Sequence, residues 1–171
     1  MLLGLGLKAM GVEVTPERVS EQVAASGPWG FLVFVGIVVG ANIIQVPAWI
    51  FVAAAGMLWP FAQAMAISYL ASVLAASVTF EVFGRAGGDA LRAIDKPWIQ
   101  KVLQTIDAHP IRGVAILRCF LLITPPVTVA LAMSGLRRRD HLIGTAIGVV
   151  LPLVAILLAA GSVGELTTAS E

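Results

Sequence analysis

Arg118 stands in the stretch "LRCFLLITPPVTVALAMSG", from Leu117 to Gly135, in which charged residues are otherwise absent. A charged side chain inside a membrane costs a few kcal/mol, and for that reason it commonly faces a cavity or a partner. The planar fork of N–H donors on a guanidinium suits a phosphate oxyanion. We therefore predict that Arg118 binds an anionic headgroup. The alternatives are an arginine that extends to the cytoplasmic interface, or one that pairs with an acid as a structural clamp.

Glu81 and Arg85 lie four residues apart near the end of an apolar stretch, in the order that favours an ion pair on one helical face. Structural pairing is the simpler interpretation. In the functional interpretation, Glu81 neutralises Arg118 until an anionic headgroup displaces it, or Glu81 titrates during transport. All three residues are therefore candidate substrate-binding residues.

Neutral polar residues also interrupt the apolar stretches. Asn42 and Gln45 lie in the first stretch, and Thr124 and Thr128 lie in the second. These side chains offer hydrogen bonds to a headgroup, and they equally suit the backbone groups that a broken helix leaves unpaired. Both interpretations stay open.

Several other chemistries are disfavoured. His109 and His141 have no partners at metal-ligand spacing, and Cys119 is the only cysteine, so we expect no metal site and no disulfide. Ser134 lacks the sequence context of a serine nucleophile. The glycine-rich "GRAGGD" does not follow a strand, which excludes a nucleotide loop. The net charge of +1 by itself says nothing about nucleic acid. We expect no nucleic acid partner, no cofactor and no enzymatic activity.

The composition indicates the setting in which these residues act. Hydrophobic residues make up 58% and charged residues 12% of the 171 residues, outside the usual range of soluble domains. No Asp, Glu, Lys or Arg occurs between Glu21 and Glu81, or from Leu142 to Gly164. A helix needs about 20 apolar residues to cross a bilayer. The sequence therefore predicts an all-α integral membrane protein.

The helical elements that must position Arg118 follow from capping signals and periodicity. We expect an N-terminal surface segment over residues 1–27, with a short helix between Thr15 and Gly27. Residues 28–165 form a single membrane-embedded domain, and residues 166–171 form a tail. Within the domain we expect a hairpin over about 29–58, a span over 61–83, an amphipathic interfacial helix over 97–108, a second hairpin over about 111–136 and a span over 141–162.

The positions of the basic residues indicate that the second stretch doubles back. Five basic residues lie from Arg85 to Arg112, and Arg137 to Arg139 form a second cluster. A continuous crossing by residues 113–136 would put the two clusters on opposite faces, against the positive-inside tendency. A break at Pro125 and Pro126 returns both clusters to the cytoplasmic side. Ordinary kinks in continuous spans are the alternative.

The two apolar stretches have the same spacing between a proline and a glycine. Gly56 follows Pro47 by nine residues in "PAWIFVAAAG", and Gly135 follows Pro126 by nine residues in "PVTVALAMSG". We predict an inverted repeat of two units, each a re-entrant helical hairpin plus a transmembrane helix. The prolines would expose backbone groups to a cavity, and the glycines would let helices approach closely. In many secondary transporters the substrate site lies where such broken helices meet.

These stretches also resemble one family. Over about residues 30–155, the order and spacing of four segments resemble the DedA family, also called the VTT or SNARE-associated Golgi protein domain. The segments are "VPAWIFVAAAG", "FEVFGRAGG", "LRCFLLITPPVTVALAMSGL" and "HLIGTAIGVVLPL". The resemblance implies two opposed re-entrant hairpins and the movement of phospholipids or undecaprenyl phosphate between leaflets. DedA proteins carry acids where this chain has Ala41, Asn42 and Trp49, and a second arginine where it has Thr124. The carboxylates that would couple transport to protons are thus missing here.

We therefore expect a multi-pass protein of the bacterial cytoplasmic (inner) membrane that moves phosphate-bearing lipids. Its partners would be membrane lipids with an anionic headgroup, and its small size is compatible with a homodimer. The alternatives are an ion-coupled small-solute transporter and a non-transporting scaffold that organises membrane proteins or lipid domains.

Overall fold

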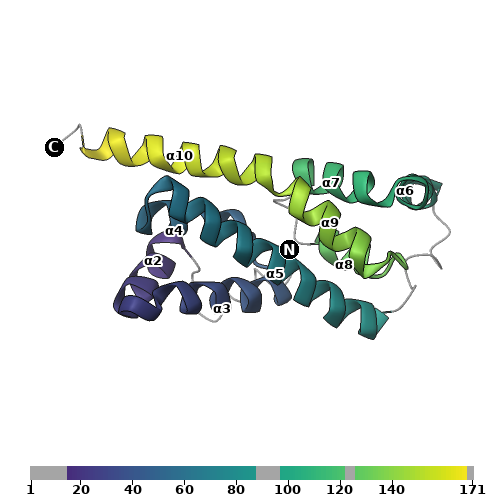
Figure 1. Cartoon of the computed structure of the whole chain (residues 1–171), viewed down its shortest axis with the longest axis horizontal. Helices are drawn as coiled ribbons and strands as arrows, with labels where there is room; N and C mark the ends of the chain where they lie inside the picture. Colours follow the sequence, from purple (N-terminus) through teal and green to yellow (C-terminus); the bar gives the residue numbers. More distant parts are fainter. Residues whose placement is uncertain (1–14, 88–96, 122–125, 169–171) are drawn as a thin grey trace.

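The computed structural model describes residues 15–87, 97–121 and 126–168, and within these ranges the chain is helical without strands (Figure 1). This confirms the predicted all-α class. The elements in chain order are α2 (Pro16–Ala25), a 3-10 turn η1 (Gly27–Trp29), α3 (Gly30–Ile43), α4 (Trp49–Leu58), α5 (Phe61–Gly87), α6 (Pro97–Ala108), α7 (Pro110–Leu121), α8 (Pro126–Ala132), α9 (Arg138–Gly148) and α10 (Val150–Thr168).

Two stretches are long and apolar enough to cross a membrane. They are Phe61–Gly87, which is α5, and Arg138–Gly161, which comprises α9 and part of α10. Large apolar side chains on both stretches are exposed, including Leu70 at 65%, Leu151 at 64% and Leu158 at 59%. A soluble surface rarely gathers so many large apolar side chains, whereas a lipid-facing surface requires them.

The second stretch bends at Val149, between α9 and α10. Pro152 cannot donate a backbone hydrogen bond to the carbonyl of Gly148, because proline has no N–H. The neighbouring bonds persist, with Leu153 N donating to Val149 O at 3.1 Å. The bend therefore has a local cause in the sequence, and it places the buried Val149 against the interior.

The N-terminal helix α2 packs on the domain rather than lying free on its surface. Its N-cap is Thr15, whose hydroxyl accepts a hydrogen bond from Arg18 N, and Pro16 opens the helix. Val19 and Val23 are buried, and a Cβ on Gly30 would lie only 2.8 Å from Val23 O. Close packing against α3 is possible because position 30 has no side chain.

The first pair of helices, α3 and α4, folds back on itself. Near the start of α3, the ring of Phe34 meets the ring of Trp59, at the end of α4, edge to face at 5.4 Å. The turn between the helices closes α3 with Val46 N donating to Ala41 O at 2.9 Å and Gln45 N donating to Asn42 O at 3.2 Å. This is the Schellman pattern of helix termination.

Pro47 lies in the non-helical link that follows this turn, so α3 ends before it and α4 begins after it. The residue in the left-handed position of the turn is Gln45, with φ 64°. Glycine is the usual residue there, because a Cβ is strained at positive φ.

In the second pair of helices, α7 and α8, helix α7 packs closely against α9. A Cβ on Gly144 would lie 2.6 Å from Val114 Cβ, and one on Gly148 would lie 2.7 Å from Arg118 Cβ. Because residue numbers rise together on both sides of this contact, α7 and α9 run in the same direction, and α7 rests directly on the glycines of α9. Helix α6 covers the other end of α7, where a Cβ on Gly113 would meet Ile106.

The two pairs approach each other from opposite ends of α5 (Figure 1). The first pair is joined to the start of α5, since α4 ends at Leu58 and α5 begins at Phe61. The second pair lies at the other end, where a Cβ on Gly84 would lie 3.6 Å from Ala132 O of α8. The turn of the first pair and the interior ends of α7 and α8 therefore converge in the middle of the molecule.

Gly56 and Gly135, the glycines at matching positions of the predicted repeat, have different surroundings. Gly56 lies within α4, and a Cβ there would lie 3.3 Å from Ala160 Cβ of α10. Gly135 lies beyond the end of α8, is exposed and has φ 71°. Gly56 thus lies at a close helix contact, as predicted, whereas Gly135 occupies a turn at positive φ, and close helix approach at Gly135 stays a prediction.

Candidate functional site

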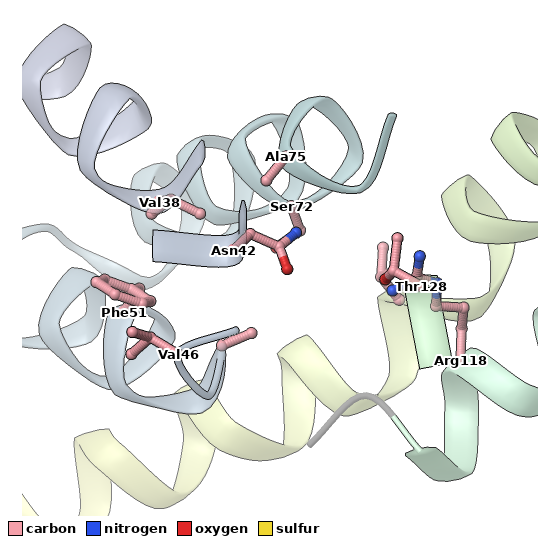
Figure 2. A pocket seen from close by; sticks show the side chains of 10 residues that line it. Val38, Asn42, Val46, Phe51, Ser72, Ala75, Arg118 and Thr128 are labelled. Carbon is pink, nitrogen blue, oxygen red and sulfur yellow. The ribbon is translucent and has the colours of Figure 1, made fainter. Parts of the chain in front are cut away.

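A cavity lies where the two helix pairs meet, and we call it the central cavity (Figure 2). It draws residues from α3, the link after it, α4, α5, α7, α8 and the bend between α9 and α10. The lining residues are Val38, Asn42, Val46, Ala48, Phe51, Ser72, Ala75, Arg118, Thr128 and Val149. Its volume of about 30 Å³ suits about one or two water molecules. Most of the lining is apolar, and the polar groups are few.

Arg118 is the charged residue of this lining, and its side chain is buried, with 7% exposed. Its Nη2 lies 3.2 Å from Nε2 of His141. Its Nε is buried without a hydrogen-bond partner among the described residues. Because an unpaired buried N–H of a cation is costly, this donor is available to a ligand oxygen. The alternative that Arg118 extends to the membrane surface is wrong, since the guanidinium lies inside the molecule.

The packing of α7 on α9 explains the course of the Arg118 side chain. Its Cβ lies beside Gly148, whereas its guanidinium lies beside His141, seven residues earlier on α9. Side chains on a helix lean toward the N-terminus, and α7 and α9 run in the same direction. The side chain therefore extends back along α9 until it meets the imidazole.

His141 is the residue of the candidate site that sequence reasoning missed. It is 1% exposed, and its ring stacks on Phe80 of α5 with centroids 4.2 Å apart. An arginine offers no acceptor, so Nε2 of His141 accepts the hydrogen bond and carries no proton. The signal in the sequence is the spacing His141, Gly144, Gly148, which puts a histidine and two small residues on one face of α9.

The neutral polar candidates divide between the cavity and the turn. Asn42 and Thr128 line the central cavity, and Figure 2 shows the Asn42 amide on the side opposite Arg118 and Thr128. Gln45 instead donates through Nε2 to the Asn42 carbonyl at 3.1 Å, which closes the turn after α3. Gln45 therefore satisfies the backbone, the second of the two interpretations. Thr124 and Pro125 lie outside the described residues, and Pro126 is the first residue of α8.

Glu81 does not neutralise Arg118 in this conformation. Its Oε2 lies 3.3 Å from Nη2 of Arg85, as the spacing predicts, and its Oε1 lies 3.1 Å from Nε of Arg138. Both carboxylate oxygens thus bond other arginines. The group that meets Arg118 is the neutral His141, so the expected acid partner is replaced by an imidazole.

Within the described ranges, no group of three His, Cys, Asp or Glu lies close enough to hold a metal ion. The polar groups of the site are one guanidinium, one imidazole, one amide and the hydroxyls of Ser72 and Thr128, in an otherwise apolar enclosure. Such a set can bind an oxyanion through charge-assisted hydrogen bonds.

Comparison with known proteins identifies the family of the chain. A family model described as the VTT domain matches residues 46–162, a range that contains Arg118, Thr128 and His141. No curated protein and no solved structure matches the chain. With a match over most of its length, the chain belongs to the VTT domain family of DedA and SNARE-associated Golgi proteins. The family and the two apolar candidate spans point to a membrane protein, and the family suggests a transporter-like role.

Proposed function

We propose that this protein moves phosphate-bearing lipids, phospholipids or undecaprenyl phosphate, between membrane leaflets, and that Arg118 receives the headgroup in the central cavity. The observation that carries the proposal is the position of Arg118. Its guanidinium is buried beside a cavity between two helix pairs, and its Nε is unpartnered among the described residues. A buried cation with a spare donor is suited to bind a phosphate oxygen.

The lengths of the helices support a re-entrant topology. Helix α3 has 14 residues and α4 has 10, which correspond to about 21 and 15 Å. Helix α7 has 12 residues and α8 has 7, about 18 and 10 Å. The hydrocarbon core is about 30 Å thick. Each of these helices reaches only partway across, so the two pairs act as opposed re-entrant hairpins of an inverted repeat.

The position of the cavity supports transport over scaffolding. In transporters built from inverted repeats, the substrate site lies near the bilayer midplane where broken helices meet. Here the turn after α3 and the interior ends of α7 and α8 meet at Arg118. A scaffold needs no charge at that depth, whereas a carrier of anionic headgroups does.

The lining favours an amphiphile over a hydrated ion. Val38, Val46, Phe51 and Val149 provide apolar surface in the walls of the cavity that Arg118 also lines, which suits the glycerol and upper acyl region next to a phosphate. A volume of about 30 Å³ is too small for a headgroup. In the described conformation the cavity is therefore too narrow for a lipid, and we infer that the hairpins separate for lipid to enter.

The basic residues set the proposed orientation. Arg85 and Arg138 lie together at one end of the molecule, bridged by Glu81. By the positive-inside tendency this end faces the cytoplasm, and the protein is a multi-pass protein of the bacterial inner membrane. Large exposed apolar side chains on α5 and α10 are available to lipid or to a second copy of the chain.

A reconstitution experiment tests the function. Purified protein is placed in proteoliposomes with a fluorescent phospholipid, and transbilayer movement is followed by the fraction of probe that an added reductant can bleach. Arg118→Gln should abolish movement, and Arg118→Lys should retain only part of it, because lysine keeps the charge without the fork. The matched control is Arg112→Gln, an exposed arginine on the same helix, which should behave as wild type.

The outcomes separate the candidate functions. Normal movement by a folded Arg118→Gln variant would refute the role of Arg118. An inactive wild type in vesicles of every lipid composition would favour the scaffold. A flux of small solutes that depends on Arg118, without lipid movement, would favour the ion-coupled solute transporter.

A further inference from the structure

A second, larger hollow lies at the basic end of the molecule, and we call it the outer hollow. It has a volume of about 270 Å³ and lies between the end of α5 and the end of α8. Its walls include Phe80, Glu81, Gly84, Arg85, Ala132 and Leu136. The two helices lie close together behind this hollow, since a Cβ on Gly84 would be in van der Waals contact with Ala132 O at 3.6 Å.

One carboxylate, that of Glu81 in the wall of the outer hollow, joins Arg85 of the same wall to Arg138 of α9. Glu81 bonds Arg85 and Arg138 at 3.3 and 3.1 Å, while the two arginine side chains are 83% and 71% exposed. Glu81 itself is only 27% exposed. Each guanidinium has several N–H donors, and the ion pair uses one nitrogen of each. The pair of arginines therefore carries one more positive charge than Glu81 neutralises, in a place that solvent and headgroups reach.

Phe80 connects the outer hollow to Arg118. It lines the hollow and stacks on His141, and His141 bonds Arg118. Two stacked rings therefore stand between a solvent-accessible basic hollow and the buried guanidinium. An anion held in the outer hollow would lie next to the aromatic wall of the proposed transport site.

We propose that the outer hollow is a second phosphate-binding site, which takes the headgroup of an anionic phospholipid, and that Glu81 is its internal competitor. The incoming phosphate would replace the Glu81 carboxylate at Arg85 and Arg138. The inference rests on the proposed function, to which it adds a docking position at the membrane surface. A basic pocket between helices at the cytoplasmic interface is a recurrent site for acidic headgroups.

The choice of a lipid over a free anion follows from the neighbouring surface. Phe80, Ala132 and Leu136 give the hollow an apolar wall, and Val82 on α5 is 44% exposed. Helix α5 is also one of the two candidate spans, so its charged end lies where headgroups lie. A bound phosphate thus has apolar surface beside it for the acyl chains.

Binding to the purified full-length protein tests the site. The protein in zwitterionic detergent is titrated with short-chain phosphatidic acid, and the apparent Kd is obtained from the concentration dependence of its thermal unfolding. Short-chain phosphatidylcholine and inorganic phosphate are titrated in parallel. Ultraviolet cross-linking of a photoactivatable phosphatidic acid, followed by peptide mapping, locates the bound lipid.

The variants should change affinity in opposite directions. Glu81→Gln removes the competitor and should tighten phosphatidic acid binding several-fold. Arg85→Gln and Arg138→Gln should each weaken it about fivefold, the contribution of one basic residue near a membrane surface. Arg139→Gln removes the same charge from the exposed first turn of α9 and should leave the affinity within about twofold. Because the signs differ, a general loss of stability does not reproduce the pattern.

Three results would overturn the proposal. They are equal effects of Arg138→Gln and Arg139→Gln, equal affinity for inorganic phosphate and phosphatidic acid, and cross-links at Asn42 or Thr128 without any at Gly84 or Leu136. Arg118→Gln separates this proposal from the proposed function. It should retain the binding in the outer hollow while losing transport, and a variant that transports normally but binds as predicted would refute only the role of Arg118.

Discussion

The guanidinium of Arg118 lies 3.2 Å from Nε2 of His141, and both side chains are buried, at 7% and 1% exposed. Because the imidazole accepts this bond, it is neutral and fixes the arginine without neutralising it. The positive charge of Arg118 therefore stays available to a phosphate. An acid in the position of His141 would hold the arginine more strongly and compete with the substrate.

Replacement of His141 tests this arrangement. His141→Phe keeps a ring against Phe80 but removes the acceptor, and it should lower the free energy of unfolding by about 1–3 kcal/mol, because Arg118 loses a buried partner. Transport should fall with it. His141→Gln supplies an acceptor of its own and should retain more of both. Thermal unfolding in micelles and the lipid-movement assay measure the two effects.

A double-mutant cycle provides the control. The combined effect of Arg118→Met and His141→Phe on stability should differ from the sum of the single effects by about 0.5–3 kcal/mol, as for residues in direct contact. Additive effects would contradict the contact.

The glycines of α9 should tolerate no side chain. A Cβ on Gly148 would lie 2.5 Å from Ala115 O, and one on Gly144 would lie 2.8 Å from Ile111 O. Backbone atoms cannot move away cheaply, so Gly148→Ala and Gly144→Ala should each destabilise by about 1–3 kcal/mol. Gly148→Ala should also impair transport, because α7 carries Arg118. Unfolding midpoints and vesicle transport report the change.

Gly36 and Gly40 on α3 are matched controls, since a Cβ at either would meet nothing within 4 Å. Alanine there should leave the protein as stable as before or raise its stability by up to about 1 kcal/mol, from helix propensity alone. If all four alanine variants behaved alike, the close contact of α7 with α9 would be refuted.

Gln45 should be replaceable by glycine with a gain in stability. Its φ of 64° costs a residue with a Cβ about 1 kcal/mol relative to glycine. The lost bond from Nε2 to Asn42 O, 3.1 Å long, offsets part of the gain. Gln45→Gly should therefore be as stable as wild type or more stable, and should transport normally. Ile44→Gly, at φ −84°, should destabilise instead, and the same result at both positions would argue against strain.

An acid in the central cavity should make transport depend on pH. Asn42→Asp puts a carboxylate opposite Arg118 in the cavity (Figure 2). At neutral and higher pH the carboxylate is charged, pairs with Arg118 and competes with the headgroup, so transport should be slow. As pH falls the acid takes up a proton and transport should recover. Asn42→Leu is the control and should show no such dependence; a flat profile for Asn42→Asp would place Arg118 out of reach.

Much of the fold was predictable because its signals are local. Thr15 and Pro16 mark the start of α2, Pro47 falls in the break between α3 and α4, and the apolar stretches give α5 and the last span. Capping, proline geometry and hydropathy act within a few residues of each other. These features are therefore visible in a sequence without knowledge of the packing.

The candidate site was only partly predictable. The rarity of a charge within an apolar stretch identified Arg118, and Asn42 and Thr128 were candidates on polarity alone. His141 was not found, because it lies 23 residues from Arg118 and no spacing rule links them. The ion pair of Glu81 with Arg85 was predictable from their spacing, whereas the bond of Glu81 to Arg138 was not, because it depends on how α9 meets α5.

The glycine contact between α7 and α9 also determines which part of the protein can move. The contact of α7 with α9 includes backbone atoms at both glycines and the bond from Arg118 to His141, so we expect the two helices to move as one rigid body together with Arg118. Opening of the central cavity then falls to the other side, where the link after α3 is short, non-helical and strained at Gln45. We expect α7 and α9 to stay fixed while the first helix pair moves, with the link after α3 as the hinge.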